Sequence, residues 1–297
     1  MKKEKILIYI AAVLATLLWG FSFVWFKQAL LFYNPITIIF LRLIIATIVL
    51  NSYIRIVGKP QKISPKDYKM FLLIAFFQPL CYFLGESFGL TYVSATVGSI
   101  IISTIPLFTP IFIYLLVKEK LTIYTFIGLI VSFGGVLLLV TKDYSGGTTL
   151  KGVALLFFAV FSAISYGIVV KKLSVNYSGF TIVKWQNTIG LFFFLPIFFI
   201  FEYSHFISVQ PSIGVILTIL KLAIFASAMA FILKVHVIKK IGLINSNIFA
   251  NLIPVFTAVI AYFILKEPLD LKRVLGILIV ICGLFVSQIP QFLKEKS

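Results

Sequence analysis

The chain has 297 residues, of which 61% are hydrophobic and only 12% are charged, and its mean hydropathy is +1.12. A soluble domain of this size cannot bury so much apolar surface, so lipid must surround much of the chain. The net charge of +17 fits either nucleic-acid binding or a membrane topology signal, and the positions of the charges decide between the two.

Ten apolar segments of about 20 residues follow one another along the chain, and a helix of that length crosses the hydrocarbon core. These segments are apolar on most faces, whereas the strands of a membrane barrel alternate over about ten residues. The sequence therefore predicts an all-α integral membrane protein with ten transmembrane helices. The predicted spans cover residues 6–27, 35–57, 69–90, 93–117, 121–141, 150–171, 179–201, 212–236, 242–265 and 271–290.

The first span follows a basic N-terminus, but it is longer than the apolar core of a signal peptide and lacks a clear cleavage site, so we expect it to be retained. With the N-terminus in the cytoplasm, 17 of the 26 basic residues lie in cytoplasmic connections, six in outer connections and three within spans. This distribution follows the positive-inside rule. It predicts a multi-pass protein of the cytoplasmic (inner) membrane with both termini in the cytoplasm, and it argues against a nucleic-acid partner.

The stretch from Ile105 to Gly135 recurs 148 residues later without a gap, and ten of its 31 positions are identical. Because each copy belongs to a set of five spans, an odd number, the second copy enters the membrane from the opposite side. The sequence therefore predicts two inverted five-helix repeats, an arrangement typical of transporters. The predicted parts are a first repeat at 1–141, a linker at 142–149, an inverted repeat at 150–290 and a cytoplasmic tail at 291–297.

Motifs for catalysis, nucleotide binding or metal binding are missing from the sequence. Cys81 and Cys282 fall in distant spans, and the two histidines, His205 and His236, are isolated, whereas metal sites need several ligands at close spacing. We therefore predict no catalytic residue, no metal and no cofactor, and no use of ATP by this chain. A membrane-embedded enzyme, which needs nucleophile and base at one depth, and a non-transporting receptor or scaffold stay as alternatives.

Several sequence pieces follow one another in an order that points to a known family. They are Leu17–Lys27 (LLWGFSFVWFK), Arg42, Gly89–Phe112 (GLTYVSATVGSIIISTIPLFTPIF), Lys118–Leu121 (KEKL), Ile241–Leu269 (IGLINSNIFANLIPVFTAVIAYFILKEPL) and Gly276–Gly283 (GILIVICG). Together they resemble the EamA-type ten-helix exporters of the drug/metabolite transporter superfamily. The resemblance covers the whole chain and implies a secondary transporter that exports small organic metabolites, often amino acids or toxic compounds. One departure is Lys234, where the resemblance implies an uncharged residue, and this leaves the substrate open.

Charged and polar residues inside spans are candidates for a substrate site, because they are costly in lipid. Gln78, Tyr82 and Glu86 follow one another at four-residue spacing in the third span and predict a polar stripe on one helix face. Arg42 lies in the outer half of the second span, so an Arg42–Glu86 pair is predicted. That pair serves either a structural purpose or a functional one, such as a proton-sensitive gate.

Two prolines sit at equivalent positions of the fourth and ninth spans, Pro106 and Pro254. Since proline has no N–H, the carbonyls of Ile102 and Ala250 lose their intrahelical partners. These carbonyls either face a wet cavity beside a pivot, or the kinks are static and serve packing. We carry both prolines as candidate hinges.

A polar pair precedes each proline, Ser99 with Ser103 and Asn247 with Asn251, again 148 residues apart. The four-residue spacing places each pair on one helix face. Because asparagine is costly in lipid, that face is expected to point to protein or to water. We favour a substrate cavity over a hydrogen bond between helices, because the polar face recurs in both copies.

Two further lysines and two aromatic residues complete the candidate substrate site. Lys184 and Lys234 are predicted near the inner face, where they either recognise a substrate carboxylate or reach lipid headgroups. Trp19 and Tyr166 are candidates for apolar cavity walls in the first and sixth spans.

The repeated Lys–Glu dipeptides, Lys118–Glu119 and Lys266–Glu267, follow the fourth and ninth spans. Inversion predicts the first of them inside and the second outside, with structural or gating roles. The complete prediction is alternating access around a midplane cavity formed mainly by spans 1, 3, 4, 6, 8 and 9. Its partners are a small-molecule substrate and the lipid bilayer, with Glu86 as the best candidate for carrying protons if protons are coupled; the oligomeric state is left open.

Overall fold

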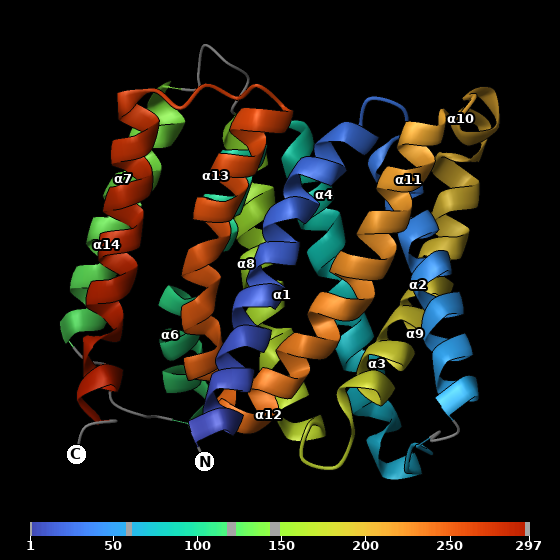
Figure 1. The fold of residues 1–297 in the computed structure, drawn as a ribbon, viewed down its shortest axis with the longest axis horizontal. Helices are drawn as coiled ribbons and strands as arrows, with labels where there is room; N and C mark the ends of the chain where they lie inside the picture. The colour runs from blue at the N-terminus through green and yellow to red at the C-terminus, as the bar shows by residue number, and fades with distance from the viewer. Residues whose placement is uncertain (1, 58–60, 118–122, 143–148, 295–297) are drawn as a thin grey trace.

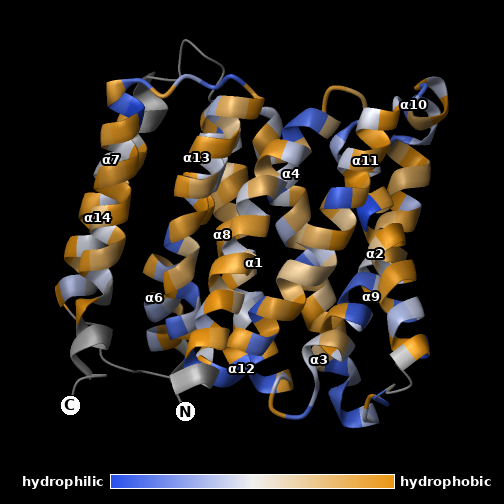
Figure 2. Cartoon of the chain, in the orientation of Figure 1, coloured by the Kyte–Doolittle hydropathy of each residue, from blue (hydrophilic) through white to orange (hydrophobic). Residues whose placement is uncertain are grey.

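The computed structural model describes residues 2–57, 61–117, 123–142 and 149–294, and within these ranges the chain is a bundle of helices without β-strands (Figure 1). Seven continuous helical stretches are long and apolar enough to cross a membrane, and the last, Ile213–Ile264, has 52 residues and holds two passes. The helices α7 (Ile123–Lys142) and α14 (Leu271–Lys294) complete ten passes. Hydrophobic residues dominate the flanks of the bundle (Figure 2), so the predicted all-α membrane fold is confirmed.

The first five passes follow the predicted spans closely, but two of them are interrupted. The third pass contains a π-helical segment at Phe76–Cys81, where Gln78 leaves helical geometry, and the fourth is broken after Ile102. Such interruptions in a membrane helix are tolerated where protein or a cavity surrounds the backbone. The helices are α1 (Lys2–Ala29), α2 (Pro35–Val57), α3 (Tyr68–Ala75), α4 (Tyr82–Thr91), α5 (Ala95–Ile102), α6 (Ile105–Val117) and α7.

The second five passes carry matching interruptions. A π-helical segment at Leu222–Met229 joins α11 to α12, and a 3₁₀ segment at Phe249–Leu252 joins α12 to α13. The turn between the eighth and ninth passes lies within α12 at Gly242, whose φ of 80° suits glycine. The helices are α8 (Leu150–Leu173), α9 (Gly179–Phe201), the short α10 (Tyr203–Ser208), α11 (Ile213–Lys221), α12 (Ala230–Ile248), α13 (Ile253–Ile264) and α14.

The two halves run in opposite directions through the bundle. Both chain ends lie at one end of it, which we call the terminal end; the other is the distal end (Figure 1). Helix α6 ends and α7 begins at the terminal end, whereas α13 ends and α14 begins at the distal end. The predicted inversion of the second repeat is therefore confirmed.

Side-chain caps begin several helices and explain where they start. Ser94, Thr149, Ser178 and Ser212 have extended backbones, and each accepts a hydrogen bond from the backbone N–H three residues later. These bonds satisfy N–H groups that a helix leaves open in its first turn. The turns between passes are thus fixed locally by the sequence.

Helices α7 and α14 pack against each other through glycines that the repeat duplicates. A Cβ atom on Gly128 would lie 2.5 Å from the carbonyl oxygen of Gly283, and one on Gly283 would lie 2.6 Å from the backbone nitrogen of Ser132. Ser132 Oγ also donates to the carbonyl of Val280 at 3.1 Å. Small residues that let two backbones approach this closely are typical of stable helix pairs in membranes.

Candidate functional site

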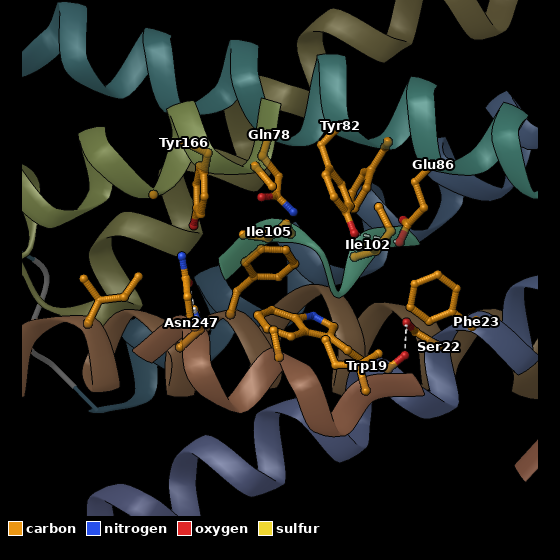
Figure 3. A pocket seen from close by; sticks show the side chains of 18 of the residues that line it. Trp19, Ser22, Phe23, Gln78, Tyr82, Glu86, Ile102, Ile105, Tyr166 and Asn247 are labelled. Atoms are coloured by element: carbon orange, nitrogen blue, oxygen red, sulfur yellow. Dashed lines mark hydrogen bonds between the residues drawn. The ribbon is translucent and has the colours of Figure 1, made fainter. Parts of the chain in front are cut away.

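A cavity lies at the seam between the two halves, and each half contributes ten of its lining residues. Its atom-free space is about 740 Å³ when the part open to solvent is included. The lining comes from the six predicted passes, with Arg42 of α2 added. We call this space the central cavity (Figure 3); it is lined by Trp19, Ser22, Phe23, Arg42, Gln78, Tyr82, Phe83, Glu86, Ile102, Ile105, Ala163, Tyr166, Gly167, Phe231, Lys234, Ile238, Leu243, Asn247, Ala250 and Ile253.

Half of these lining residues form pairs that are 148 positions apart, the same shift that relates the two repeats. The cavity therefore surrounds the axis that exchanges the two halves, where a substrate contacts both of them. One pair has opposite charges, with Glu86 in the first half and Lys234 in the second. The five pairs are Trp19 with Gly167, Phe83 with Phe231, Glu86 with Lys234, Ile102 with Ala250 and Ile105 with Ile253.

One wall of the central cavity carries the polar stripe of the third pass. Gln78, Tyr82 and Glu86 all point from this pass into the cavity (Figure 3). The Tyr82 hydroxyl donates to Glu86 Oε1 at 2.8 Å, and Glu86 is only 8% exposed. Because the π-helical segment begins just before Gln78, its side chain is aimed from a locally unwound turn. The wall offers a carboxylate, a phenol and an amide at successive turns.

Arg42 lines the same cavity but does not make the predicted ion pair with Glu86. Its Nε donates to Ser227 Oγ at 2.9 Å, and its guanidinium lies 4.3 Å from the centroid of the Phe83 ring. An Arg42–Glu86 ion pair is absent within the described part of the chain, where both residues lie. The direct pairing was wrong because each group has a nearer partner. Arg42 and Glu86 both line the cavity and interact electrostatically without direct contact.

Lys234 points into the protein and does not reach toward headgroups. Its Nζ donates to the carbonyl of Ser246 and to Asn247 Oδ1, both at 2.9 Å. Asn247 Nδ2 in turn donates to Thr109 Oγ1 at 3.0 Å, which links α12 to α6. Carbonyls become available here because the α-helix changes to a 3₁₀ turn, and a cation at such a helix end is favourable. The lipid-facing alternative for Lys234 was wrong.

The two prolines mark the helix breaks beside the cavity. Pro106 is the second residue of α6, and Pro254 is the second residue of α13. In the first turn of a helix the missing N–H of proline costs nothing. Both prolines therefore begin a new half-helix after the interruption. The residues whose carbonyls were predicted to be freed, Ile102 and Ala250, both line the cavity.

The polar pairs before the prolines do not all reach the cavity. Asn247 lines it, whereas Ser99, Ser103 and Asn251 are buried outside its lining. Ser99 Oγ donates to the carbonyl of Thr96 and Ser103 Oγ to that of Ile100, each at 2.7 Å. A serine hydroxyl can make its hydrogen bond to a carbonyl of its own helix in this way. The same helix face therefore does not have to contact water or substrate in both repeats.

The aromatic candidates line the central cavity, whereas Lys184 does not. Trp19 and Tyr166 both contact the ring of Phe231 edge-on, with centroid distances of 5.3 and 6.1 Å. The Tyr166 hydroxyl also donates to Gln186 Oε1 at 2.7 Å. Lys184 lies outside the central cavity, with its Nζ 5.2 Å from the centroid of its neighbouring tryptophan ring.

At the distal end, Glu267 ties the second half to the first. Its carboxylate accepts hydrogen bonds from the backbone N–H of Ala95 at 2.8 Å and of Thr96 at 3.2 Å, and from Thr96 Oγ1 at 2.6 Å. It therefore caps the N-terminus of α5. The neighbouring Lys266 is exposed and has a φ of 58°. Lys118 and Glu119, the equivalent pair in the first repeat, lie outside the described residues.

Sequence reasoning missed a second carboxylate with the same arrangement. Glu202, at the end of α9, accepts from the N–H of Ile36 at 3.2 Å and of Thr37 at 2.6 Å, and from Thr37 Oγ1 at 2.8 Å. It was overlooked because it lies at the end of a predicted span. The signal was present in the sequence, since both capped helices carry threonine as an early residue. Phe231, also missed, had no signal among 32 phenylalanines.

Metal ligands and cysteine pairs give no further chemistry. Among the described residues, no group of three or more His, Cys, Asp or Glu side chains is placed to hold a metal ion. Cys81 and Cys282 are both free thiols. The site brings together one carboxylate, two cations and an aromatic wall, which suits reversible binding of a small amphoteric molecule.

The described part of the chain makes ten passes in two inverted halves, with a charged cavity at the seam between them. This arrangement defines a multi-pass membrane transporter. The sequence comparisons agree with this class. The model of the EamA-like transporter family matches residues 6–141 and 150–288, and the chain belongs to that family.

Similar proteins carry the same general description. An uncharacterized transporter of Archaeoglobus fulgidus is 27% identical over 94% of this chain and 97% of its own length. The uncharacterized transporter YetK of Bacillus subtilis is 30% identical over 84% of this chain and 77% of its own length. A solved crystal structure shares the fold with a TM-score of 0.66 and 15% identity, covering 92% of this chain and 98% of its own.

Proposed function

We propose that this protein is a secondary transporter that exports small organic metabolites, such as amino acids or related compounds, by alternating access. The observation that carries the proposal is the central cavity, which lies on the axis relating the halves and contains Arg42, Glu86 and Lys234. Charges inside a membrane protein are costly, and they mark pathways for substrates or ions. The lysine and arginine distribution supports the cytoplasmic membrane with both termini in the cytoplasm.

In this proposal the cavity binds opposite ends of an amphoteric substrate in different places. A substrate carboxylate lies near Arg42 or Lys234, and an ammonium group lies near Glu86. Gln78 and Tyr82 add hydrogen bonds from the same wall, and Trp19 and Tyr166 hold the apolar body of the substrate. Because Lys234 already bonds Asn247, the substrate exchanges one hydrogen-bond partner for another.

Alternating access requires hinges within the helices and gates that close each side of the cavity. The breaks before Pro106 and Pro254 adjoin the cavity, and each separates a pass into two half-helices that can tilt independently. The hydrogen bonds of the Glu267 carboxylate to the first residues of α5 serve as a closure at the distal end. Opening that side must separate the two halves and break these bonds. Lys266, and Lys118 with Glu119 at the equivalent hairpin of the first repeat, complete the proposed gating set.

The decisive experiment is counterflow in proteoliposomes loaded with single amino acids or aromatic cations. We expect uptake of labelled substrate to rise when the same compound is inside, relative to protein-free liposomes. Repeating the assay across a pH gradient tests proton coupling: Glu86→Gln should remove any stimulation by the gradient while counterflow persists. Binding without flux would support a receptor or scaffold instead, and chemical conversion of the compound would support an enzyme.

A further inference from the structure

A second hollow, separate from the central cavity, is lined by residues of α3, of the segment before it and of α9. The first turns of α3 and α9 lie near the terminal end of the bundle (Figure 1). We call this hollow the terminal groove, and the residues used in the argument are Lys62, Tyr68, Lys69, Leu72, Trp185 and Ile189. None of these residues lines the central cavity. Transport as proposed above does not use the groove.

The groove changes from basic to apolar along its length. Lys62 precedes α3 and Lys69 is its second residue, so both lie where that helix enters the membrane. Leu72 follows within one turn, and its side chain is 51% exposed on the outer surface of the bundle. Ile189 lies ten residues into α9, which is about 15 Å along the helix. Cations therefore mark the mouth of the groove and apolar side chains its deeper wall.

Aromatic rings lie between these two parts. Trp185 is six residues into α9, about 9 Å from its start, and Tyr68 begins α3. Tryptophan and tyrosine are enriched at the level of lipid headgroups, where one side of the ring is apolar and the other is wet. Lys184 Nζ lies 5.2 Å from the Trp185 ring centroid and adds a third cation beside the groove.

The loop that carries Lys62 is fastened to the other half of the protein. Gln61 Nε2 donates to the carbonyl of Asn176 at 2.7 Å, and the Tyr177 hydroxyl donates to Asp67 Oδ2 at 2.7 Å. The hydrogen bond to Asp67 raises the pKa of Tyr177 above its ordinary value, so the phenol stays a donor. The segment from 61 to 69 carries three lysines and one aspartate, and that aspartate is occupied by Tyr177.

We propose that the terminal groove binds one anionic phospholipid of the leaflet at the terminal end of the bundle. Its phosphate lies between Lys62 and Lys69, and an acyl chain follows Leu72 and Ile189. Basic residues at a membrane surface attract anionic headgroups, and the apolar wall favours a lipid over free phosphate. The pairing of a fixed basic mouth with an exposed apolar wall distinguishes this place from the scattered lysines elsewhere at this end.

The test is native mass spectrometry of the delipidated full-length protein with added dioleoyl phosphatidylglycerol or dioleoyl phosphatidylcholine. We expect one phosphatidylglycerol to be retained in preference to phosphatidylcholine. The double variant Lys62→Ala with Lys69→Ala should weaken that binding by about tenfold. The double variant Lys62→Arg with Lys69→Arg should preserve it, which controls for folding. The matched control is Lys171→Ala with Lys172→Ala, two exposed lysines at the end of α8, which should bind like the unchanged protein.

Three results would overturn the proposal. An equal loss in the Lys171 and Lys172 control would show general attraction by surface charge. Equal retention of phosphatidylcholine would show that the lysines do not select the headgroup. Competition by glycerophosphoglycerol at the same concentration as the intact lipid would show a phosphate site to which the apolar wall contributes nothing. Replacing Leu72 by Gln tests that wall directly, since it should weaken lipid binding and leave headgroup binding unchanged.

Discussion

Two of the contacts between the halves of the protein have opposite chemistry. Between α7 and α14, at what we call the glycine seam, the backbones touch through Gly128, Gly135 and Gly283, and none of the side chains described in these two helices is a buried charge. At the central cavity, by contrast, the halves face each other across Arg42 and other buried polar groups. The repeat keeps glycine in both copies at the glycine seam, as Gly128 with Gly276 and Gly135 with Gly283, whereas at the central cavity the equivalent residues Glu86 and Lys234 have opposite charges.

This difference separates the parts that hold the halves together from the parts that bind. Close backbone contact has a single good arrangement, because interiors this dense do not deform gradually. A polar cavity can exchange hydrogen-bond partners at little cost. We therefore expect substitutions at the glycine seam to act on stability, and those at the central cavity to act on transport.

The largest effect is expected from Gly128→Leu at the glycine seam. Since a Cβ atom there would lie 2.5 Å from a backbone oxygen, the two helices must separate, at a cost of about 3 kcal/mol. Thermal unfolding in detergent should show a strongly lowered midpoint. Gly134→Leu is the matched control on the same helix, because a Cβ atom there meets nothing within 4 Å. Equal damage from both variants would show that α7 tolerates no larger residue anywhere.

Lys234→Met is expected to give the next largest effect, this time on transport. The change keeps the length of the side chain but removes the donor to Ser246 and Asn247. Buried carbonyls left without a donor cost about 2 kcal/mol, so counterflow should fall about 30-fold. Lys239→Met, an exposed lysine on the same helix, should transport normally. Normal flux in Lys234→Met would remove this lysine from the proposed site.

Asn247→Ala compared with Ser99→Ala tests whether the repeats differ in chemistry at equivalent positions. Asn247 bridges Lys234 and Thr109 beside the cavity, whereas Ser99 bonds only a carbonyl of its own helix. Counterflow is expected to fall about tenfold for Asn247→Ala and by less than about twofold for Ser99→Ala. If Ser99→Ala were the more damaging change, the polar function would belong to the first repeat.

The fold was predictable because lipid imposes one strong rule on sequence. A pass must be apolar for about 20 residues, and the spans at 35–57 and 179–201 match α2 and α9 residue for residue. The interruptions were harder to place. Proline marked the breaks in the fourth and ninth passes, but the π-helical segment at Leu222–Met229 contains no proline and left no trace in the hydropathy.

The candidate site was predicted in part, because composition shows which residues are costly in lipid but not which partner each one finds. Glu86 and Lys234 both reached the cavity for that reason. The Arg42–Glu86 pairing failed because Tyr82 and Ser227 offered closer partners. Serine and asparagine at equivalent positions looked alike by spacing, yet of these four residues Asn247 alone lines the cavity.

The smallest effects are expected from the two distal carboxylates, Glu202 and Glu267, which cap the first turns of α2 and α5. Replacing either by Gln removes a negative charge from a helix N-terminus, which is worth about 1 kcal/mol. The loss should be larger for Glu202, which is only 6% exposed, than for Glu267, which is partly open to solvent. Thermal unfolding midpoints of the two variants measure this difference.

For access to the central cavity the order of the two variants should be reversed, with the larger effect from Glu267→Gln. If Glu267 closes the distal side, Glu267→Gln raises the rate at which a membrane-impermeant thiol reagent labels Ser22→Cys, a residue of the cavity lining. The background for this assay carries Ala in place of Cys81 and Cys282, the two native thiols. Glu202→Gln should leave that rate unchanged, because α2 and α9 also pack at the terminal end through the stacked rings of Tyr53 and Phe180, whose centroids are 4.9 Å apart. Faster labelling in Glu202→Gln alone would assign the closure to the contact between Glu202 and the start of α2.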